Sequence, residues 1–153
     1  MPVLDPPTSL VKRNAASGDI LAIDVPHLGC VIAKVLYTSR FFKDVMLNGT
    51  YGMRPGIHVA AIPTQSPSLL LYTATTCVRK QAHWNIIGTQ DVSARERQLS
   101  QRIVAGEVWV EDTELRPATR TDRRCLPEMG VLGYLGVEQA IRQAFGPPQA
   151  LSR

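Results

Sequence analysis

Apolar residues in this sequence occur in short runs separated by turn signals, which restricts the chain to a fold built mainly from short strands. The first run, residues 20–25, is rich in β-branched side chains and follows a turn signal at residues 17–19. Residues 26–29 form the next turn, and residues 31–36 make a second apolar run. Two such runs joined by a short turn predict a β-hairpin.

Further strands are expected along the rest of the chain, at residues 45–47, 57–62, 69–77, 84–87 and 108–110. Asn48-Gly49 is a strong turn dipeptide. Residues 48–56 contain three glycines and a proline, and we expect them to form an exposed loop. The polar region after residue 89 is ambiguous, and a helix starting at Ser93 would place Leu99 and Ile103 on one face.

Two helices are expected near the C-terminus. Thr119 followed by Asp122 resembles a capping box and predicts a short helix over residues 120–126, which Pro127 ends. The second helix ends at Gly146 and has one apolar face, formed by Val137, Ala140, Ile141, Ala144 and Phe145. The only surface against which this helix can pack is the sheet.

These elements predict a mostly β (α+β) fold. We expect an antiparallel sheet or a small, partly open β-barrel, with a short helix and a C-terminal amphipathic helix packed on it. The length of 153 residues favours one domain, assigned to residues 17–146. Residues 1–16 contain several prolines and are expected to be a disordered or loosely packed lead-in, and residues 147–153 a tail.

The sequence disfavours two locations, the membrane and the secretory route. No apolar run approaches the roughly 20 residues needed to span a bilayer. The N-terminus lacks the charged and apolar regions of a signal peptide. We therefore expect a cytoplasmic protein that does not contact membranes, with Cys30, Cys77 and Cys125 reduced and structural, because they form no CxxC pair.

The net charge of +4 is dispersed along the chain. Residues 1–100 hold ten basic and six acidic side chains, and residues 101–153 hold seven of each. Nucleic-acid-binding proteins usually concentrate their positive charge on one face. The adjacent basic pairs Arg79-Lys80 and Arg123-Arg124 are interpreted as solvated surface.

No catalytic motif is found. The chain has three histidines, none in a metal-binding spacing: His27, His58 and His83. His27 lies three residues from Cys30, but no third group is evident to orient the imidazole of a Cys–His nucleophile. The carboxylates of Glu111, Asp112 and Glu114 are typical of a hydrated turn. We expect no enzyme activity, no cofactor and no metal.

A basic and aromatic segment is one candidate binding feature. Arg40-Phe41-Phe42-Lys43 could stack bases and hold phosphates if it lay on a sheet. The favoured interpretation is that one phenylalanine packs into the core and the charges flank it.

Residue types common at protein interfaces give a second set of candidates. The segment containing Tyr51 and Arg54 carries such types, although an ordinary glycine-rich surface turn would look the same. The partner-binding candidates are Tyr51, Arg54, Arg40 and Arg79.

Several segments, taken in order, resemble a known bacterial family. They are residues 18–23 (GDILAI), 29–36 (GCVIAKVL), 83–88 (HWNIIG) and 116–119 (RPAT), the last leading into Arg123, Arg124 and Leu126. Together they resemble the immunity protein 26 family of bacterial polymorphic toxin systems, over residues 17–145.

The resemblance implies a small, mostly β, cytoplasmic protein that neutralises a cognate toxin. No catalytic residues of the family are carried over to this sequence. We expect a monomer or weak dimer. Within the matched motifs, Trp84, Ile86 and Ile87 are expected to fill the core, with Gly88 ending their strand. Arg116 and Thr119 are expected to fix the start of the C-terminal helix.

Other hypotheses stay open beside the immunity protein. The net charge and residues 40–43 allow a nucleic-acid-binding small β-barrel, although we consider nucleic acid an unlikely partner. A small hydrolase using Cys30 is a third. A basic protein is also a poor match for a strongly basic nuclease target, because like charges repel.

Overall fold

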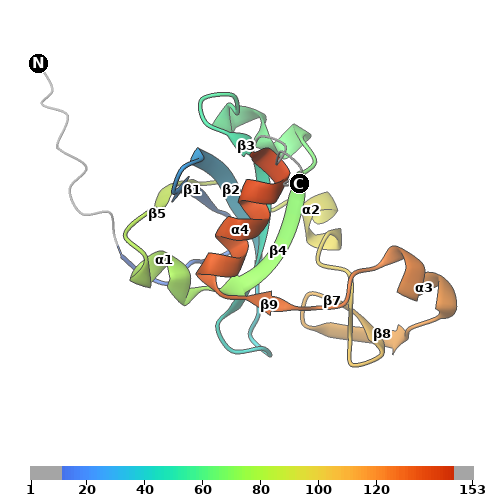
Figure 1. The fold of residues 1–153 in the computed structure, drawn as a ribbon. Helices are drawn as coiled ribbons and strands as arrows, with labels where there is room; N and C mark the ends of the chain where they lie inside the picture. The colour runs from blue at the N-terminus through green and yellow to red at the C-terminus, as the bar shows by residue number, and fades with distance from the viewer. Residues whose placement is uncertain (1–11, 147–153) are drawn as a thin grey trace, which may run out of the picture.

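The computed structural model describes residues 12–146, and its main element is a six-stranded sheet (Figure 1). The strands are β1 (Asp19–Val25), β2 (Gly29–Thr38), β3 (Val45–Met53), β4 (Leu69–Ala74), β5 (Trp84–Thr89) and β9 (Val131–Leu132). Their order is β5-β1-β2-β3-β4-β9, and neighbours are antiparallel except β4 and β9. The expected mostly β class is confirmed, with an open, mixed sheet in place of a barrel.

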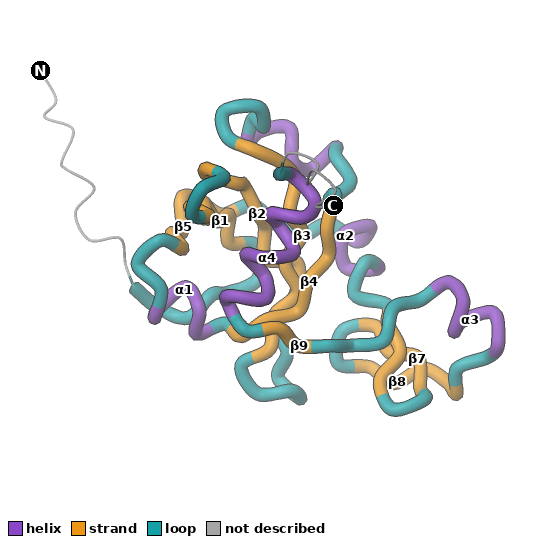
Figure 2. Tube along the Cα trace, viewed as in Figure 1, coloured by secondary structure: helices purple, strands orange, loops and turns teal. Residues whose placement is uncertain are grey.

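A second, three-stranded sheet forms a small lobe at one end of the main sheet (Figure 2). We define the small lobe as β6 (Arg102–Val104), β7 (Glu107–Val110), β8 (Thr113–Pro117) and helix α3 (Arg120–Cys125). All residues of β8 are exposed, so this lobe has little core of its own. Its position depends on contacts with the main sheet.

Helix α4 (Tyr134–Phe145) covers one face of the main sheet, as its apolar periodicity predicts (Figure 1). Val137 and Ile141 are buried in the largest apolar cluster, together with residues of β1 and β2. The carboxylate of Glu138 is also buried, and it accepts bonds from Trp84 Nε1 at 3.1 Å and His83 Nε2 at 2.7 Å. This carboxylate ties α4 to the start of β5.

The opposite face of the sheet is covered by short elements. These are the 3-10 helix η1 (Val59–Thr64), helix α2 (Ala94–Gln98) and the small lobe, while α1 (Thr76–Lys80) follows β4. Ile62 of η1 packs on Ile20 and Ile32, and Tyr72 packs on Leu47. Because both faces are covered, β1 and β2 are buried on both sides, which explains their nearly continuous apolar runs.

The segment after β2 departs most from the sequence-based expectation. Asn48-Gly49 is not a turn but lies inside β3, paired with β2 on one side and β4 on the other. A Cβ atom on Gly49 would lie 3.1 Å from Leu36 and from Pro67, so a close approach of chains requires glycine there. The expected exposed loop over 48–56 is therefore wrong for its first part, because pairing on two sides outweighs a local turn preference.

Three other boundaries were also wrong. Residues 59–62 lie in η1 instead of a strand, residues 57 and 58 precede that helix, and only Ile62 of the six is buried. The strand expected over 69–77 ends at Ala74, and α1 begins at Thr76. The helix starting after Ser93 exists but ends at Gln98, so that Ile103 lies in β6. Strand β8 was not expected after 108–110, because its sequence is polar and fully exposed.

The ends of the chain divide differently from the expectation. Residues 1–11 and 147–153 lie outside the described residues. Residues 12–16 have no regular secondary structure, yet Arg13 forms a two-bond ion pair with buried Asp19 at 2.8 and 2.9 Å. The ammonium of Lys12 donates to the carbonyls of Gln81 and Trp84 at 2.9 and 3.1 Å. In the described part of the chain, helices are all too short or too polar to cross a bilayer.

A buried ion pair joins the sheet to α2. Lys34 on β2 is fully buried, and its Nζ lies 3.0 Å from Glu96 Oε2 and donates to the Asp91 carbonyl at 2.9 Å. Glu96 also closes a capping box with Ser93 at the start of α2. Because a buried charge without a partner costs several kcal/mol, each member of the pair requires the other.

The acidity of Glu96 follows from these contacts. Burial alone raises the pKa of this carboxyl, but the bonds from Ser93 and Lys34 outweigh burial and leave the pKa below its usual value of 4.5. A folded-state pKa below the unfolded one gives stability that is complete above about pH 4.5. We expect that contribution to be lost as the pH falls through the lowered value.

Replacing Glu96 tests the ion pair. E96Q keeps the size of the side chain but leaves the Lys34 ammonium buried without a counter-charge, so unfolding in urea should show a loss of about 3 kcal/mol. The double variant K34M/E96Q should recover most of that loss, and E114Q, at an exposed position, should change stability little. An E96Q protein as stable as the wild type would contradict the assignment.

Candidate protein-binding surface

The carboxylate of Asp112, at the β7–β8 turn, organises the loop that follows β2. Its Oδ1 accepts bonds from the Tyr37 hydroxyl and from Ser39 Oγ at 2.6 Å, and its Oδ2 accepts from the Arg40 amide at 2.8 Å. Ser39 Oγ in turn accepts from the amides of Phe41 and Phe42 at 3.1 and 2.7 Å. The loop is therefore held from outside by Asp112 and from within by its own Ser39 side chain.

This network sets the ionisation of the groups within it. Burial alone raises the pKa of Asp112, but the bonds from Ser39, Tyr37 and the Arg40 amide outweigh burial and lower it. Burial and the bond to Asp112 raise the pKa of Tyr37 to about 12. Asp112 is thus a carboxylate and Tyr37 a neutral donor at neutral pH, which is the arrangement that the network needs.

A buried guanidinium lies directly beneath this loop. Arg102 on β6 has no exposed surface, and its Nη1 donates to the carbonyls of Ser100 and Glu111 at 3.2 and 2.7 Å. Its Cζ lies 5.4 Å from the Tyr37 ring centre, 5.8 Å from that of Phe42 and 5.3 Å from that of Tyr72. The aromatic rings provide cation–π attraction, and among residues 12–146 no carboxylate forms an ion pair with this charge.

Three aromatic rings above Arg102 form what we call the aromatic cluster: Phe41, Phe42 and Trp109. Phe41 lies 4.9 Å from Phe42 and 5.3 Å from Trp109, and Phe42 lies 5.5 Å from Trp109, measured between ring centres. Phe42 packs inward, whereas Phe41 is 66% exposed. A phenylalanine held in solvent by a fixed loop is a candidate contact for another molecule.

The basic and aromatic segment is therefore divided. As favoured from the sequence, Phe42 packs on the core, and Arg40 and Lys43 are exposed beside it. Phe41, in contrast, contacts the rings of Phe42 and Trp109 and is mostly exposed to solvent. Trp109 comes from a strand almost 70 residues further along the chain, so the sequence did not reveal its part in the cluster.

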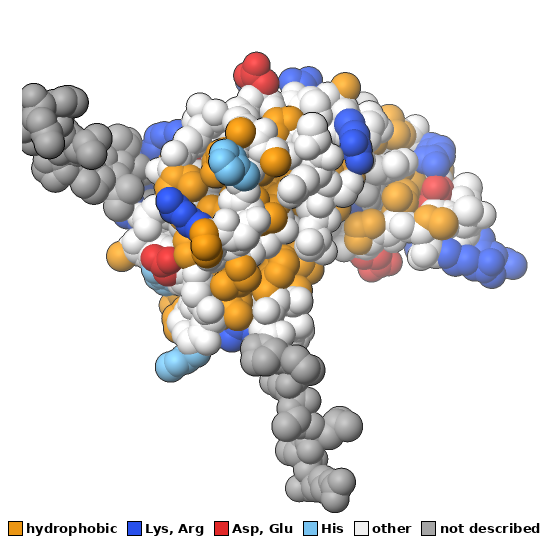
Figure 3. Space-filling view, turned by 90° about the horizontal axis from the view of Figure 1, so that it is seen from above, with side chains coloured by type: hydrophobic (Ala, Val, Ile, Leu, Met, Phe, Trp, Pro, Cys, Tyr) orange, Lys and Arg blue, Asp and Glu red, His pale blue; other side chains and the backbone are white. Residues whose placement is uncertain are grey.

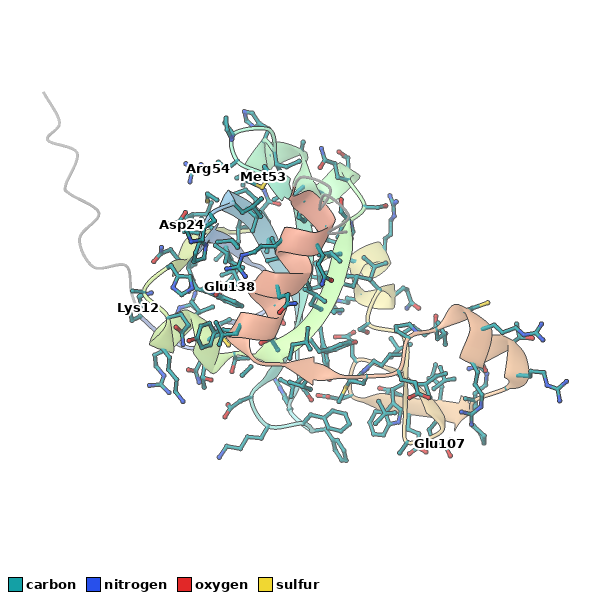
Figure 4. All side chains as sticks on the ribbon, viewed as in Figure 1. Lys12, Asp24, Met53, Arg54, Glu107 and Glu138 are labelled. Atoms are coloured by element: carbon teal, nitrogen blue, oxygen red, sulfur yellow. The ribbon has the colours of Figure 1, made fainter. Side chains whose placement is uncertain are left out.

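The four partner-binding candidates do not lie together. Arg40 borders the aromatic cluster, Arg79 lies exposed on α1 with its Nε bonded to Asn14, and Arg54 is exposed beyond the end of β3. Figure 4 shows Arg54 at the end of the molecule opposite Glu107, which lies on the strand of Trp109. Only Arg40 is placed at the aromatic cluster.

Tyr51 does not lie in an exposed loop. It is 5% exposed within β3 and packs with Ile20, Ile32 and Ile62. Burial, together with the nearby Glu96 carboxylate, raises its pKa well above the ordinary range. Tyr51 is thus a core residue in this structure, and its expected place on the surface is wrong.

The residues assigned to structural motifs are placed as follows. Trp84 is fully buried, but Ile87 is 40% exposed, so the expectation that Ile87 fills the core is wrong. Gly88 is part of the edge strand β5. Thr119 and Asp122 form the expected capping box, and Arg116 Nη2 donates to Asp122 at 2.8 Å. These contacts fix the start of α3, not of the C-terminal helix.

The groups with possible chemistry are dispersed. Burial and Asp24 raise the pKa of the Cys30 thiol, which disfavours the reactive thiolate of the hydrolase hypothesis. Cysteines 30, 77 and 125 are free. Within residues 12–146, no three side chains of the usual ligand types stand close enough to hold a metal ion.

A polar hollow of about 580 Å³ lies between the main sheet and the small lobe. The residues that line it include Gln90, Asp91, Arg97 and Glu111. This polar and charged lining differs from the mostly apolar lining typical of small-molecule sites.

Comparisons with known proteins identify no relative of this chain. No family model matches this chain, and neither a curated protein nor a solved structure matches it.

Removing the Asp112 carboxylate tests whether it organises the surface. D112A leaves the Tyr37 and Ser39 hydroxyls and the Arg40 amide without their acceptor, so we expect a loss of about 3 kcal/mol in urea unfolding. Trp109 fluorescence should change as well, because its neighbours in the loop are released. E128A, which removes an exposed carboxylate outside this network, is the control and should change neither quantity; unchanged fluorescence in D112A would contradict the assignment.

Proposed function

We propose that this protein acts by binding another protein through the aromatic cluster, and that the partner is a toxin which it neutralises in the cytoplasm. The exposed Phe41, held by the Asp112 network, is the observation that supports binding. The toxin as partner rests on the resemblance of residues 17–145 to the immunity protein 26 family.

The aromatic cluster has the properties of an interface centre. Aromatic residues and arginine are enriched where binding energy concentrates, and here Arg40 borders Phe41 and Trp109. The loop is already ordered by hydrogen bonds from its side chains and amides. A surface fixed before binding loses little conformational entropy on association, which favours affinity.

A binding protein of this kind needs no catalytic residues. An inhibitor acts by occupying a surface of its target, and the affinity depends on complementary shape and on a few buried contacts. Phe41 is suited to enter an apolar pocket of the partner, with Arg40 and Lys43 at the rim.

Nucleic-acid binding is the second candidate, because Arg40, Phe41 and Lys43 are all exposed on one loop. Such a pattern can stack a base and contact phosphates. Glu114 pairs with Trp109 in the sheet, and Asp112 lies under the loop, so carboxylates border the aromatic cluster. Their negative charge opposes a phosphate backbone, which is why a protein partner is favoured.

Co-expression tests the proposal directly. The toxin encoded next to this protein should arrest cells when expressed alone, and co-expression should restore growth. A tagged pull-down treated with nuclease and washed at low and high salt should retain the same toxin in stoichiometric amount. Absence of both protection and complex would exclude the immunity function, and loss of the bound material on nuclease treatment would favour the nucleic-acid hypothesis.

Phe41 provides the sharpest variant. F41A should weaken toxin binding by about 2 kcal/mol, or roughly thirtyfold, because it removes the exposed ring at the proposed centre of the interface. Folding should be unaffected, since the side chain is 66% exposed. L135A, which removes a similarly exposed side chain on α4, should bind as the wild type does; equal binding by F41A would place the interface elsewhere.

A further inference from the structure

Helix α3 presents three arginines on one face of the small lobe. Arg120, Arg123 and Arg124 are exposed and stand at positions i, i+3 and i+4, which lie side by side on a helix. Figure 3 shows basic side chains projecting at the right-hand end of the molecule, on the side where Figure 1 places α3. Among residues 12–146, the ion pairs involve other basic side chains, so these three arginines are unpaired there.

The helix is built to hold this face in place. A capping box between Thr119 and Asp122 begins it, and Arg116 binds the same carboxylate at 2.8 Å. Arg123 and Arg124 in the last turn are favourable next to the negative end of the helix. Arg120 lies in the first turn, away from the negative end of the helix, and the like charges of Arg123 and Arg124 repel it. The stability of the helix therefore does not explain why all three positions are arginine.

We infer that these three arginines bind a cluster of carboxylates on the partner protein. This inference rests on the proposed function, since it assigns charge to the partner that meets the aromatic cluster. Trp109 and α3 belong to the same small lobe, so one partner can contact both. Guanidinium groups bind carboxylates through two parallel hydrogen bonds, which gives such contacts direction as well as charge.

Phosphate would satisfy the same guanidinium chemistry, but the surroundings favour carboxylates. Glu107 and Glu114 lie on β7 and β8, and Glu128 pairs beside Ile103 of β6. The same part of the molecule therefore carries carboxylates as well as the three arginines. A compact acidic segment fits such a surface, whereas the long phosphate backbone of a nucleic acid would also meet these carboxylates.

Fluorescence anisotropy with two labelled probes, an oligoglutamate peptide and a single-stranded oligonucleotide, tests the inference on the full chain. The wild type should bind the peptide at low salt and lose it at high salt. R120Q/R123Q/R124Q should weaken peptide binding about tenfold. K80Q/R95Q/R97Q, which removes three exposed charges from other helices, should leave it unchanged, as should F41A.

Two results would overturn the inference: peptide binding that the α3 variant does not weaken, or oligonucleotide binding that exceeds peptide binding and is lost in that variant. The second result would assign α3 to phosphate. The proposed function fails separately, when the toxin neither binds nor is neutralised. If the α3 variant loses peptide binding while F41A still binds the toxin fully, the aromatic cluster is not the binding site, and the inference about α3 stands.

Discussion

The guanidinium of Arg102 is the group on which the position of the small lobe depends. It enters the main sheet between Tyr37, Phe42 and Tyr72 and is completely buried. A buried charge is costly unless it is compensated. Two carbonyls and three aromatic rings compensate it in part, because its Nε and Nη2 have no hydrogen-bond partner among the described residues. The rings belong to the main sheet and its loop, while the arginine belongs to β6. Separating the two sheets would break these cation–π contacts and expose the three rings to water, so the junction resists opening.

The same junction explains why an exposed aromatic ring can be held in a fixed place. Phe42 packs toward Arg102 on one side and contacts Phe41 and Trp109 on the other. Asp112 binds the loop from the β7–β8 turn, so the loop is fastened to both the main sheet and the small lobe. The buried Arg102 guanidinium and the exposed Phe41 ring are thus connected through Phe42. A substitution at Arg102 would therefore be expected to change the position of Phe41.

Local patterns in the sequence predicted several elements correctly. The continuous apolar runs predicted the β1–β2 hairpin, the apolar periodicity predicted helix α4, and the spacing of Thr119 and Asp122 predicted the capping box of α3. Where chain pairing on both sides decided the outcome, local signals failed: Asn48-Gly49 became part of a central strand. Tyr51, in the same strand, is buried because it packs with Ile20, Ile32 and Ile62.

The candidate surface could be predicted only in part. Arg40 to Lys43 stood out because basic and aromatic residues alternate there. Nothing in the sequence brings Trp109 or Asp112 next to that segment, because their contacts depend on how the two sheets meet. The acidic turn at Glu111 and Asp112 looked like hydrated surface, yet it accepts most of the bonds that order the loop.

The small lobe is the part of the molecule with the least apolar burial, since β8 is wholly exposed and α3 has no buried residue. Regions with few buried contacts open at lower free energy than the core. A partner that binds the aromatic cluster and α3 together would therefore act on the least stable region and stabilise it by mass action. The proposed binding residues lie on this lobe and on the loop after β2, whereas the largest apolar cluster lies beneath α4.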